Sequence, residues 1–229
     1  VPFIEDKTKT MYPGGFVKDP HVGIHDNIVS FDLNSLYPSI IMQYNMSPET
    51  IANGEITNFD LEGVLTKSSR PNNKGKALAA NGQYFNTDRP GIVPFIVDEM
   101  YKERVEIKKN MIEAQKRLQT ADKEDKQEIY NIERDIAISE NQQMSIKILL
   151  NSLYGALGNK YFRFFDQRIA EAITLTVHLT IRWAEYTINS HLNRILKNGT
   201  WKDYVVAIDT DSLYVSLDYL VKHFSPTDT

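Results

Sequence analysis

The chain of 229 residues contains no cysteine. Disulfide bonds, thiolate nucleophiles and cysteine-based zinc sites are therefore excluded. No apolar run approaches the length that spans a bilayer, and the first residues lack the basic and apolar segments of a signal peptide. We expect no membrane partner.

Basic residues do not outnumber acidic ones. The sequence has 30 acidic residues against 26 Lys and Arg, with a formal net charge of −4. A protein that simply coats nucleic acid should be basic, so this balance argues against that class. It remains compatible with an enzyme that uses acids to hold metal ions and keeps its basic residues local.

Two aspartates, Asp209 and Asp211, lie between two apolar, β-branched runs near the end of the sequence. This pattern predicts two short strands joined by a tight turn that carries both carboxylates. Taken alone, the stretch is equally typical of an ordinary solvated turn. Asp32 ends another strand-like run at 27–33. If both elements share a sheet, the three carboxylates converge and require divalent cations, because neighbouring like charges raise each other's pKa.

Long stretches without glycine or proline predict the helices. Residues 95–119 and 123–150 show apolar side chains three and four positions apart, which predicts a helical hairpin with Thr120 or Asp122 capping its second arm. Gly155 and Gly158 are expected to end that arm. Residues 167–196 predict a third helix packed on a sheet. Residues 52–92, rich in glycine, proline and asparagine, predict loops with two short strands and a turn at Asn81–Gly82. The fold class is α+β.

A polar face is predicted on the second long helix, where Lys147, Asn151 and Tyr154 follow one another at steps of four and three. A cation, an amide and an aromatic ring on one face can meet a triphosphate and a base together. Arg104 and Lys108 make a basic spot on the preceding helix. The alternative is a glycine-capped helix end with an ordinary tyrosine and solvated cations.

Three segments resemble the polymerase motifs of family B DNA polymerases, in that family's order: 32–40, 147–155 and 209–212. The flanking segments 12–18 and 47–52 are similar to the branch found in T4-like bacteriophages. The resemblance implies a polymerase palm, with an antiparallel sheet and packed helices, plus a projecting helical-hairpin fingers domain. Residues 1–93 and 158–229 would form the palm, and residues 94–157 the fingers.

The resemblance also implies template-directed DNA synthesis, in which a primer 3′-hydroxyl attacks the α-phosphate of a deoxynucleoside triphosphate and releases pyrophosphate. Two Mg²⁺ ions would assist, and Mn²⁺ could substitute. Asp32 and Asp211 would be the main metal ligands, with the Leu33 carbonyl assisting and Asp209 as a weaker ligand.

The remaining roles that the resemblance implies concern the nucleotide. Its binding residues would be Ser35 and Leu36 (backbone N–H groups on phosphates), Tyr37 (a clash with a 2′-hydroxyl), Arg104, Lys108, Lys147 and Asn151 (the triphosphate), and Tyr154 and Gly155 (the nascent base pair). Lys147 is also a candidate to protonate the leaving pyrophosphate.

Two departures from the family pattern stand out. Ala207 and Ile208 replace the usual Tyr-Gly, so we expect altered contact with the primer. No exonuclease motif precedes Asp32 and no thumb follows the third motif. Because the chain also starts at Val1 rather than Met, we expect a portion of a larger enzyme with weak DNA affinity of its own.

The implied partners are primer-template DNA, deoxynucleoside triphosphates, the remaining polymerase domains or a partner chain (exonuclease, thumb), and a sliding clamp. The implied location is the replication fork in the cytoplasm of an infected bacterial host. Three alternatives stay open: an RNA-synthesising palm enzyme, a non-autonomous half of a split polymerase, and a degenerate relative that only binds nucleotide or DNA.

Overall fold

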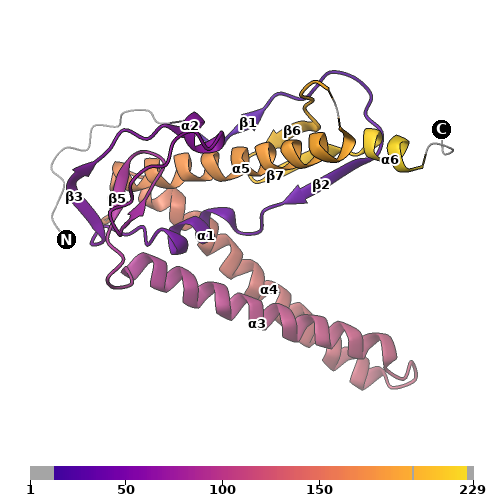
Figure 1. The fold of residues 1–229 in the computed structure, drawn as a ribbon. Helices are drawn as coiled ribbons and strands as arrows, with labels where there is room; N and C mark the ends of the chain where they lie inside the picture. Colours follow the sequence, from indigo (N-terminus) through magenta and orange to yellow (C-terminus); the bar gives the residue numbers. More distant parts are fainter. Residues whose placement is uncertain (1–12, 198, 226–229) are drawn as a thin grey trace.

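The computed structural model describes residues 13–197 and 199–225, which form six helices, a four-stranded sheet and a three-stranded sheet. Both sheets are antiparallel, and helices and strands are interspersed along the chain (Figure 1). The predicted α+β class is confirmed. Tyr12, which begins one of the segments similar to the phage branch, lies outside the described residues.

The larger sheet has the strand order β1–β6–β7–β2. Its strands are β1 (Val17–Lys18), β2 (Ile28–Asp32), β6 (Val205–Asp209) and β7 (Ser212–Ser216). The predicted hairpin is β6–β7, and the predicted strand at 27–33 is β2. Ser212 lies opposite Asp32 on one side and opposite Asp209 on the other. The register therefore brings the acidic ends of β2 and β6 to the same edge.

Helix α5 (Gln167–Leu196) contacts β6 and β7, as predicted for the third long helix (Figure 1). Ile181 on α5 is fully buried in one cluster with Val205, Leu213 and Val215. Strand side chains alternate between the two faces of a sheet. The apolar face therefore packs against α5, and the other face is left for polar groups. Helix α6 (Asp218–Phe224) follows β7.

The smaller sheet has the order β3–β5–β4 and lies in the segment predicted to be rich in loops. Its strands are β3 (Ile51–Ile56), β4 (Ala77–Leu78) and β5 (Gln83–Phe85). Gly82, with φ of 82°, makes the predicted turn before β5. Helix α2 (Leu61–Leu65) was not predicted, because five residues are too few to show a helical period. The Asp60 side chain caps it by accepting the Gly63 N–H.

Helices α3 (Ile92–Thr120) and α4 (Lys126–Leu157) form the predicted hairpin, which projects from the rest of the chain (Figure 1). The expected cap was wrong. Asp125, rather than Thr120 or Asp122, accepts the Glu128 N–H at 2.9 Å. Gly158 ends α4 as predicted, whereas Gly155 lies inside the helix.

Helix α1 (Leu36–Gln43) begins directly after β2 and packs between the hairpin and α5. Pro38 lies in its first turn, where a missing N–H is tolerated. None of the helices in residues 13–197 and 199–225 combines the length and apolarity needed to cross a bilayer.

Candidate active site

One cavity of about 470 Å³ brings the three motifs together. We call it the motif cavity. Its walls come from the end of β2, the start of α1, the middle of α3, the last third of α4 and the β6–β7 turn. It is lined by Asp32, Asn34, Ser35, Leu36, Tyr37, Pro38, Arg104, Lys147, Asn151, Tyr154 and Asp211.

Two carboxylates face the motif cavity: Asp32 from the end of β2 and Asp211 from the β6–β7 turn. The Ser212 hydroxyl donates to Asp32 Oδ2 at 3.2 Å, and the Leu33 N–H donates to the Asp211 carbonyl at 2.9 Å. Burial raises the pKa of Asp211, and the charges of Asp32 and Asp209 raise it further. The site therefore opposes a second negative charge until a cation is present.

The donor set suits a magnesium ion only in part. Among the described residues, no three His, Cys, Asp or Glu side chains gather closely enough to form a metal cluster by themselves. Asp209 is exposed and does not line the motif cavity. Mg²⁺ commonly takes one or two protein carboxylates and completes its shell with water and phosphate oxygens. Asp32 and Asp211 at the mouth of a cavity open to a ligand fit that pattern.

The start of α1 presents backbone donors to the same space. Ser35 precedes the helix in the left-handed region, with φ of 52° and ψ of 43°, and its side chain makes no capping hydrogen bond. The first N–H groups of a helix have no partner within it, and they carry partial positive charge. Ser35 and Leu36 both line the motif cavity, so these donors are available to an anion.

Basic and amide groups close the opposite wall. Lys147, Asn151 and Tyr154 share one face of α4, as predicted, and all three line the motif cavity. Arg104 joins them from α3, and its Nε is buried with no hydrogen-bond partner among the residues that the structure describes. A buried guanidinium nitrogen without a partner is costly in the protein alone, and an anionic ligand would satisfy it.

Two residues of the predicted nucleotide set do not line the motif cavity. Lys108, one turn beyond Arg104 on α3, is exposed. Gly155 is exposed on α4, and a Cβ built on it meets no atom within 4 Å. The space beside Gly155 is therefore open for a ligand.

Two tyrosines that line the motif cavity pack against each other. The rings of Tyr37 and Tyr154 have centroids 4.7 Å apart and are tilted by 47°. Burial raises the pKa of Tyr37 to about 12, with help from Tyr154 and the negative charge of Asp211. The Tyr154 hydroxyl bonds the Thr174 hydroxyl of α5 at 2.6 Å. The Tyr37 phenol is thus neutral at physiological pH, and its ring packs against Tyr154, which Thr174 holds in turn.

Sequence reasoning assigned no role to Asn34, Pro38 or Thr174. Asn34 and Pro38 line the motif cavity, and their place within the first motif was the available signal. Thr174 is fully buried on α5 and also donates to the Ala170 carbonyl at 3.0 Å. A lone threonine in an apolar helix gave no sign of a contact with Tyr154.

The unusual Ile208 is 1% exposed and packs in the core beneath α5 with Leu213 and Val215. The next residue, Asp209, is exposed on the other face of the strand. The bulk of Ile208 is therefore accommodated by the core, on the side of β6 away from the acids.

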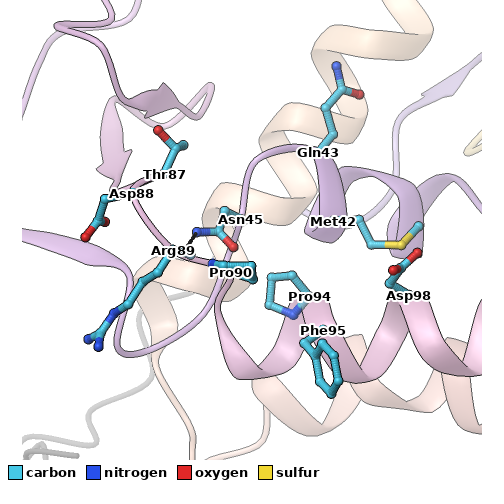
Figure 2. Close-up of a pocket in the computed structure, with 10 residues that line it drawn as sticks. All are labelled: Met42, Gln43, Asn45, Thr87, Asp88, Arg89, Pro90, Pro94, Phe95 and Asp98. Atoms are coloured by element: carbon cyan, nitrogen blue, oxygen red, sulfur yellow. Dashed lines mark hydrogen bonds between the residues drawn. The ribbon is translucent and has the colours of Figure 1, made fainter.

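A second cavity, of about 410 Å³, lies at the base of α3 and contains none of the predicted residues (Figure 2). Asn45 braces it: its side chain accepts the Gly91 N–H at 2.7 Å and donates to the carbonyls of Asn86 and Arg89. The Arg89 side chain points away from the other labelled groups in Figure 2. This cavity is formed where the end of α1 and the loop at residues 87–90 meet the first turns of α3.

Comparisons with known proteins agree with the motifs. The model of DNA polymerase family B matches residues 1–224. The chain is 33% identical over 246 residues to the DNA-directed DNA polymerase of Escherichia phage RB69, covering 92% of this chain and 27% of that protein. For the enzyme of Enterobacteria phage T4 the identity is 30%, over 93% of this chain and 28% of the relative. For DNA polymerase 1 of Pyrococcus abyssi it is also 30%, over 93% and 22%.

The chain therefore spans between 22% and 28% of the length of these relatives. The match extends over nearly all of its residues and includes all three motifs that line the motif cavity. The chain belongs to DNA polymerase family B.

Proposed function

We propose that this chain is the palm and fingers portion of a DNA-directed DNA polymerase, which adds deoxynucleotides to a primer 3′-hydroxyl. One observation carries the proposal: carboxylates from the first and third motifs, helix N–H groups from the first motif, and cationic and amide groups from the second motif and from α3 line one cavity. Phosphoryl transfer requires this combination, because its catalysis is mainly positioning and charge neutralisation.

The domain assignment follows the same reasoning. Residues 1–93 and 158–229 would be the palm, since they carry the sheet and both cavity-facing acids. Residues 94–157 would be the fingers, since α3 and α4 project from the sheet and bring Arg104, Lys147 and Asn151 to its edge. The boundary in α4 lies close to Gly158, where the helix ends.

Asp32 and Asp211 would hold the metal ions, with the Leu33 carbonyl and Asp209 as secondary ligands. Mg²⁺, or Mn²⁺ in its place, would neutralise the triphosphate and lower the pKa of the attacking hydroxyl. The protein itself contributes a rigid support, because the β2–β7 register fixes Asp32 opposite Ser212, and the Leu33 N–H holds the neighbouring Asp211 carbonyl. The raised pKa of Asp211 is consistent with a site that gains stability when a cation binds.

The triphosphate would lie between the α1 N–H groups of Ser35 and Leu36 and the side chains of Arg104, Lys147 and Asn151. Lys108 would reach it only from its exposed position on α3. Lys147 would also be placed to protonate the leaving pyrophosphate. That step predicts that the basic limb of the pH–rate profile changes in Lys147→Ala, and an unchanged profile would exclude it.

Tyr37 would select the sugar. Its ring is held by Tyr154 and is neutral, so it offers a flat apolar surface that a 2′-hydroxyl would meet without a charged partner. Tyr37→Ala should raise ribonucleotide incorporation relative to deoxynucleotide incorporation. Equal use of both nucleotides by the unaltered chain would favour the RNA-synthesising alternative. Gly155 and Tyr154 would pack against the new base pair.

Nucleotide binding tests the site without requiring turnover. We expect Arg104→Gln to weaken the binding of a fluorescent deoxynucleoside triphosphate by at least about tenfold, since it removes a charge-assisted contact. Arg134→Gln is the matched control, because Arg134 is exposed near the far end of the hairpin on α4. Equal affinity in the two variants would refute the assignment of the motif cavity to nucleotide.

Primer extension tests the reaction itself. The chain should extend a primed template in the presence of Mg²⁺, alone or when supplied with the remaining polymerase domains, and Asp211→Ala should abolish extension. Activity that survives Asp211→Ala would refute the metal assignment.

A non-autonomous portion of a split polymerase is the second candidate, favoured by the 22–28% of the relatives' length that the chain spans. That candidate predicts extension only with a partner chain that supplies thumb and exonuclease. DNA affinity of the chain alone should be weak, because much of the phosphate-binding surface would lie elsewhere. The proposed partners are primer-template DNA and a sliding clamp. The proposed location is the cytoplasm of an infected bacterium.

A further inference from the structure

A short segment runs beside β6 and contacts the turn that carries the acids. We call residues 14–21 the strap. Val17 in β1 pairs with Asp209, and the Thr210 N–H donates to the Phe16 carbonyl at 2.8 Å. Thr210 lies in the left-handed region with φ of 56°, an unfavourable conformation for a β-branched residue. The turn needs support from outside itself, and the strap supplies a hydrogen bond at that residue.

Gly15 allows the strap to lie this close. A Cβ at Gly15 would come within 2.7 Å of Thr210 Oγ1 and 3.0 Å of its Cγ2. The threonine side chain is stiff at χ1, so it cannot simply rotate away. The strap and the acidic turn are therefore in direct contact at Gly15 and Phe16.

Helix α5 in turn holds the strap at this point. The Nε2–H of His178 donates to the Gly14 carbonyl, and the His178 ring meets the Phe16 ring edge to face, with centroids 5.7 Å apart. Arg182, one turn further along α5, lies over the same Phe16 ring at 5.8 Å and is paired with Glu62 at 2.6 Å. His178 therefore contacts the strap at both Gly14 and Phe16.

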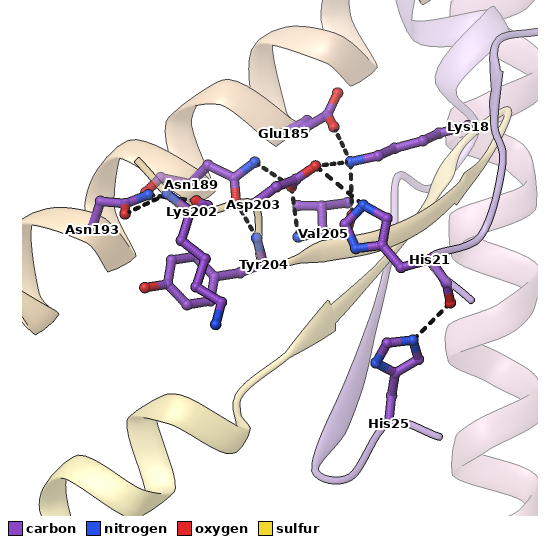
Figure 3. Close-up of polar contacts among 10 residues, drawn as sticks. All are labelled: Lys18, His21, His25, Glu185, Asn189, Asn193, Lys202, Asp203, Tyr204 and Val205. Atoms are coloured by element: carbon purple, nitrogen blue, oxygen red, sulfur yellow. Dashed lines mark hydrogen bonds and ion pairs between the residues drawn. The ribbon is translucent and has the colours of Figure 1, made fainter. Parts of the chain in front are cut away.

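The other end of the strap is fastened separately (Figure 3). Lys18 Nζ donates to Glu185 at 2.6 Å, to the Val205 carbonyl at 2.7 Å and to Asp203. The backbone N–H of His21 donates to the Val206 carbonyl at 2.8 Å. Loss of the His178 contact would thus loosen residues 14–16, where Arg182 still lies over the Phe16 ring, while residues 18–21 stay in place. The effect would fall on the acidic turn.

We propose that His178 is a positioning residue for the Asp209–Asp211 turn. Through Gly14 and Phe16 it keeps the Phe16 carbonyl on the Thr210 N–H, and this fixes the direction of the Asp211 carboxylate toward Asp32. The consequence for divalent-cation affinity rests on the proposed function, whereas the consequence for the turn does not.

Three variants test the inference: His178→Ala, which removes donor and ring; His178→Gln, which keeps an N–H donor; and His191→Ala, the control. His191 is exposed near the end of the same helix, where the Arg194 guanidinium lies 3.1 Å from its Nδ1. Backbone hydrogen exchange in the metal-free protein is the first measurement. Exchange in a peptide covering residues 205–216 should accelerate roughly fivefold in His178→Ala, the factor expected for one lost hydrogen bond.

The second measurement is Mn²⁺ binding followed by electron paramagnetic resonance. Affinity should fall roughly fivefold in His178→Ala and recover in His178→Gln, with His191→Ala unchanged. Unchanged exchange at the turn in His178→Ala would overturn the proposal. So would acceleration in all peptides, because that would indicate a general structural role. If the unaltered chain binds no Mn²⁺, the proposed metal site fails, and the exchange comparison still decides the role of His178.

Discussion

The substitution Ile208→Gly restores the residue that the family usually has before its acidic turn, and we predict that it destabilises this chain. Truncation of a buried isoleucine to alanine costs about 2–5 kcal/mol. Glycine within a strand adds about 0.5–1 kcal/mol through backbone entropy. Ile208 is 1% exposed and belongs to the core under α5. We therefore expect the free energy of unfolding to fall by about 4 kcal/mol.

Two further variants separate the contributions. Ile208→Val removes one methylene group from the same place and should cost about 1 kcal/mol. Ala207→Gly introduces glycine at the neighbouring, half-buried position and should cost about 0.5–1 kcal/mol through the backbone alone. The three values together form a series in which the buried side chain accounts for most of the loss.

Urea unfolding followed by the fluorescence of Trp183 and Trp201 measures these changes, since Trp183 lies on α5 and Trp201 lies in the segment between α5 and β6. A loss below about 1.5 kcal/mol in Ile208→Gly, or a loss no greater than in Ala207→Gly, would refute the burial argument. Such a result would place the Ile208 side chain outside the core. It would return the residue to the primer-facing role that its position next to Asp209 first suggested.

Further predictions concern single hydrogen bonds and charges. Tyr154→Phe and Thr174→Val should each lower the free energy of unfolding, and a double-mutant cycle in urea should give a coupling of about 1 kcal/mol for their 2.6 Å hydrogen bond; strict additivity would contradict the contact. Burial raises the pKa of Asp203, but hydrogen bonds from Lys18 and Asn189 outweigh it and hold that pKa below its usual value. The resulting stability is complete above about pH 4 and is lost as pH falls through the lowered pKa. The free energy of unfolding should therefore depend less on pH in this acid range in Asp203→Asn. Asp125→Ala removes the cap of α4 and should lower the thermal midpoint in calorimetry by the equivalent of about 1 kcal/mol; no change would assign the cap elsewhere.

Local periodicity was sufficient for the elements that carry the site. The β6–β7 hairpin, the α3–α4 pair and α5 were all predicted, because alternation and helical spacing express contacts between near neighbours. The shared face of Lys147, Asn151 and Tyr154 was predictable for the same reason, since helix geometry alone sets it. Helix α2 and the cap at Asp125 were missed. Helix α2 is too short to show a helical period, and the cap at Asp125 depends on one side chain among several equivalent neighbours.

The available chemistry of this protein can be taken from its amino-acid order alone: which acids, cations and aromatic rings are present, and in what order along the chain. Which of them meet follows from the packing of helices and strands. The β2–β7 register sets Asp32 beside Asp211, packing of α3 on α4 carries Arg104 to Lys147, and α5 brings His178 to the strap. The sheet also decided that Ile208 faces the core while Asp209 faces solvent. The physical reason is that these contacts join residues far apart in the chain, and their geometry depends on strand register and helix packing that no local pattern records.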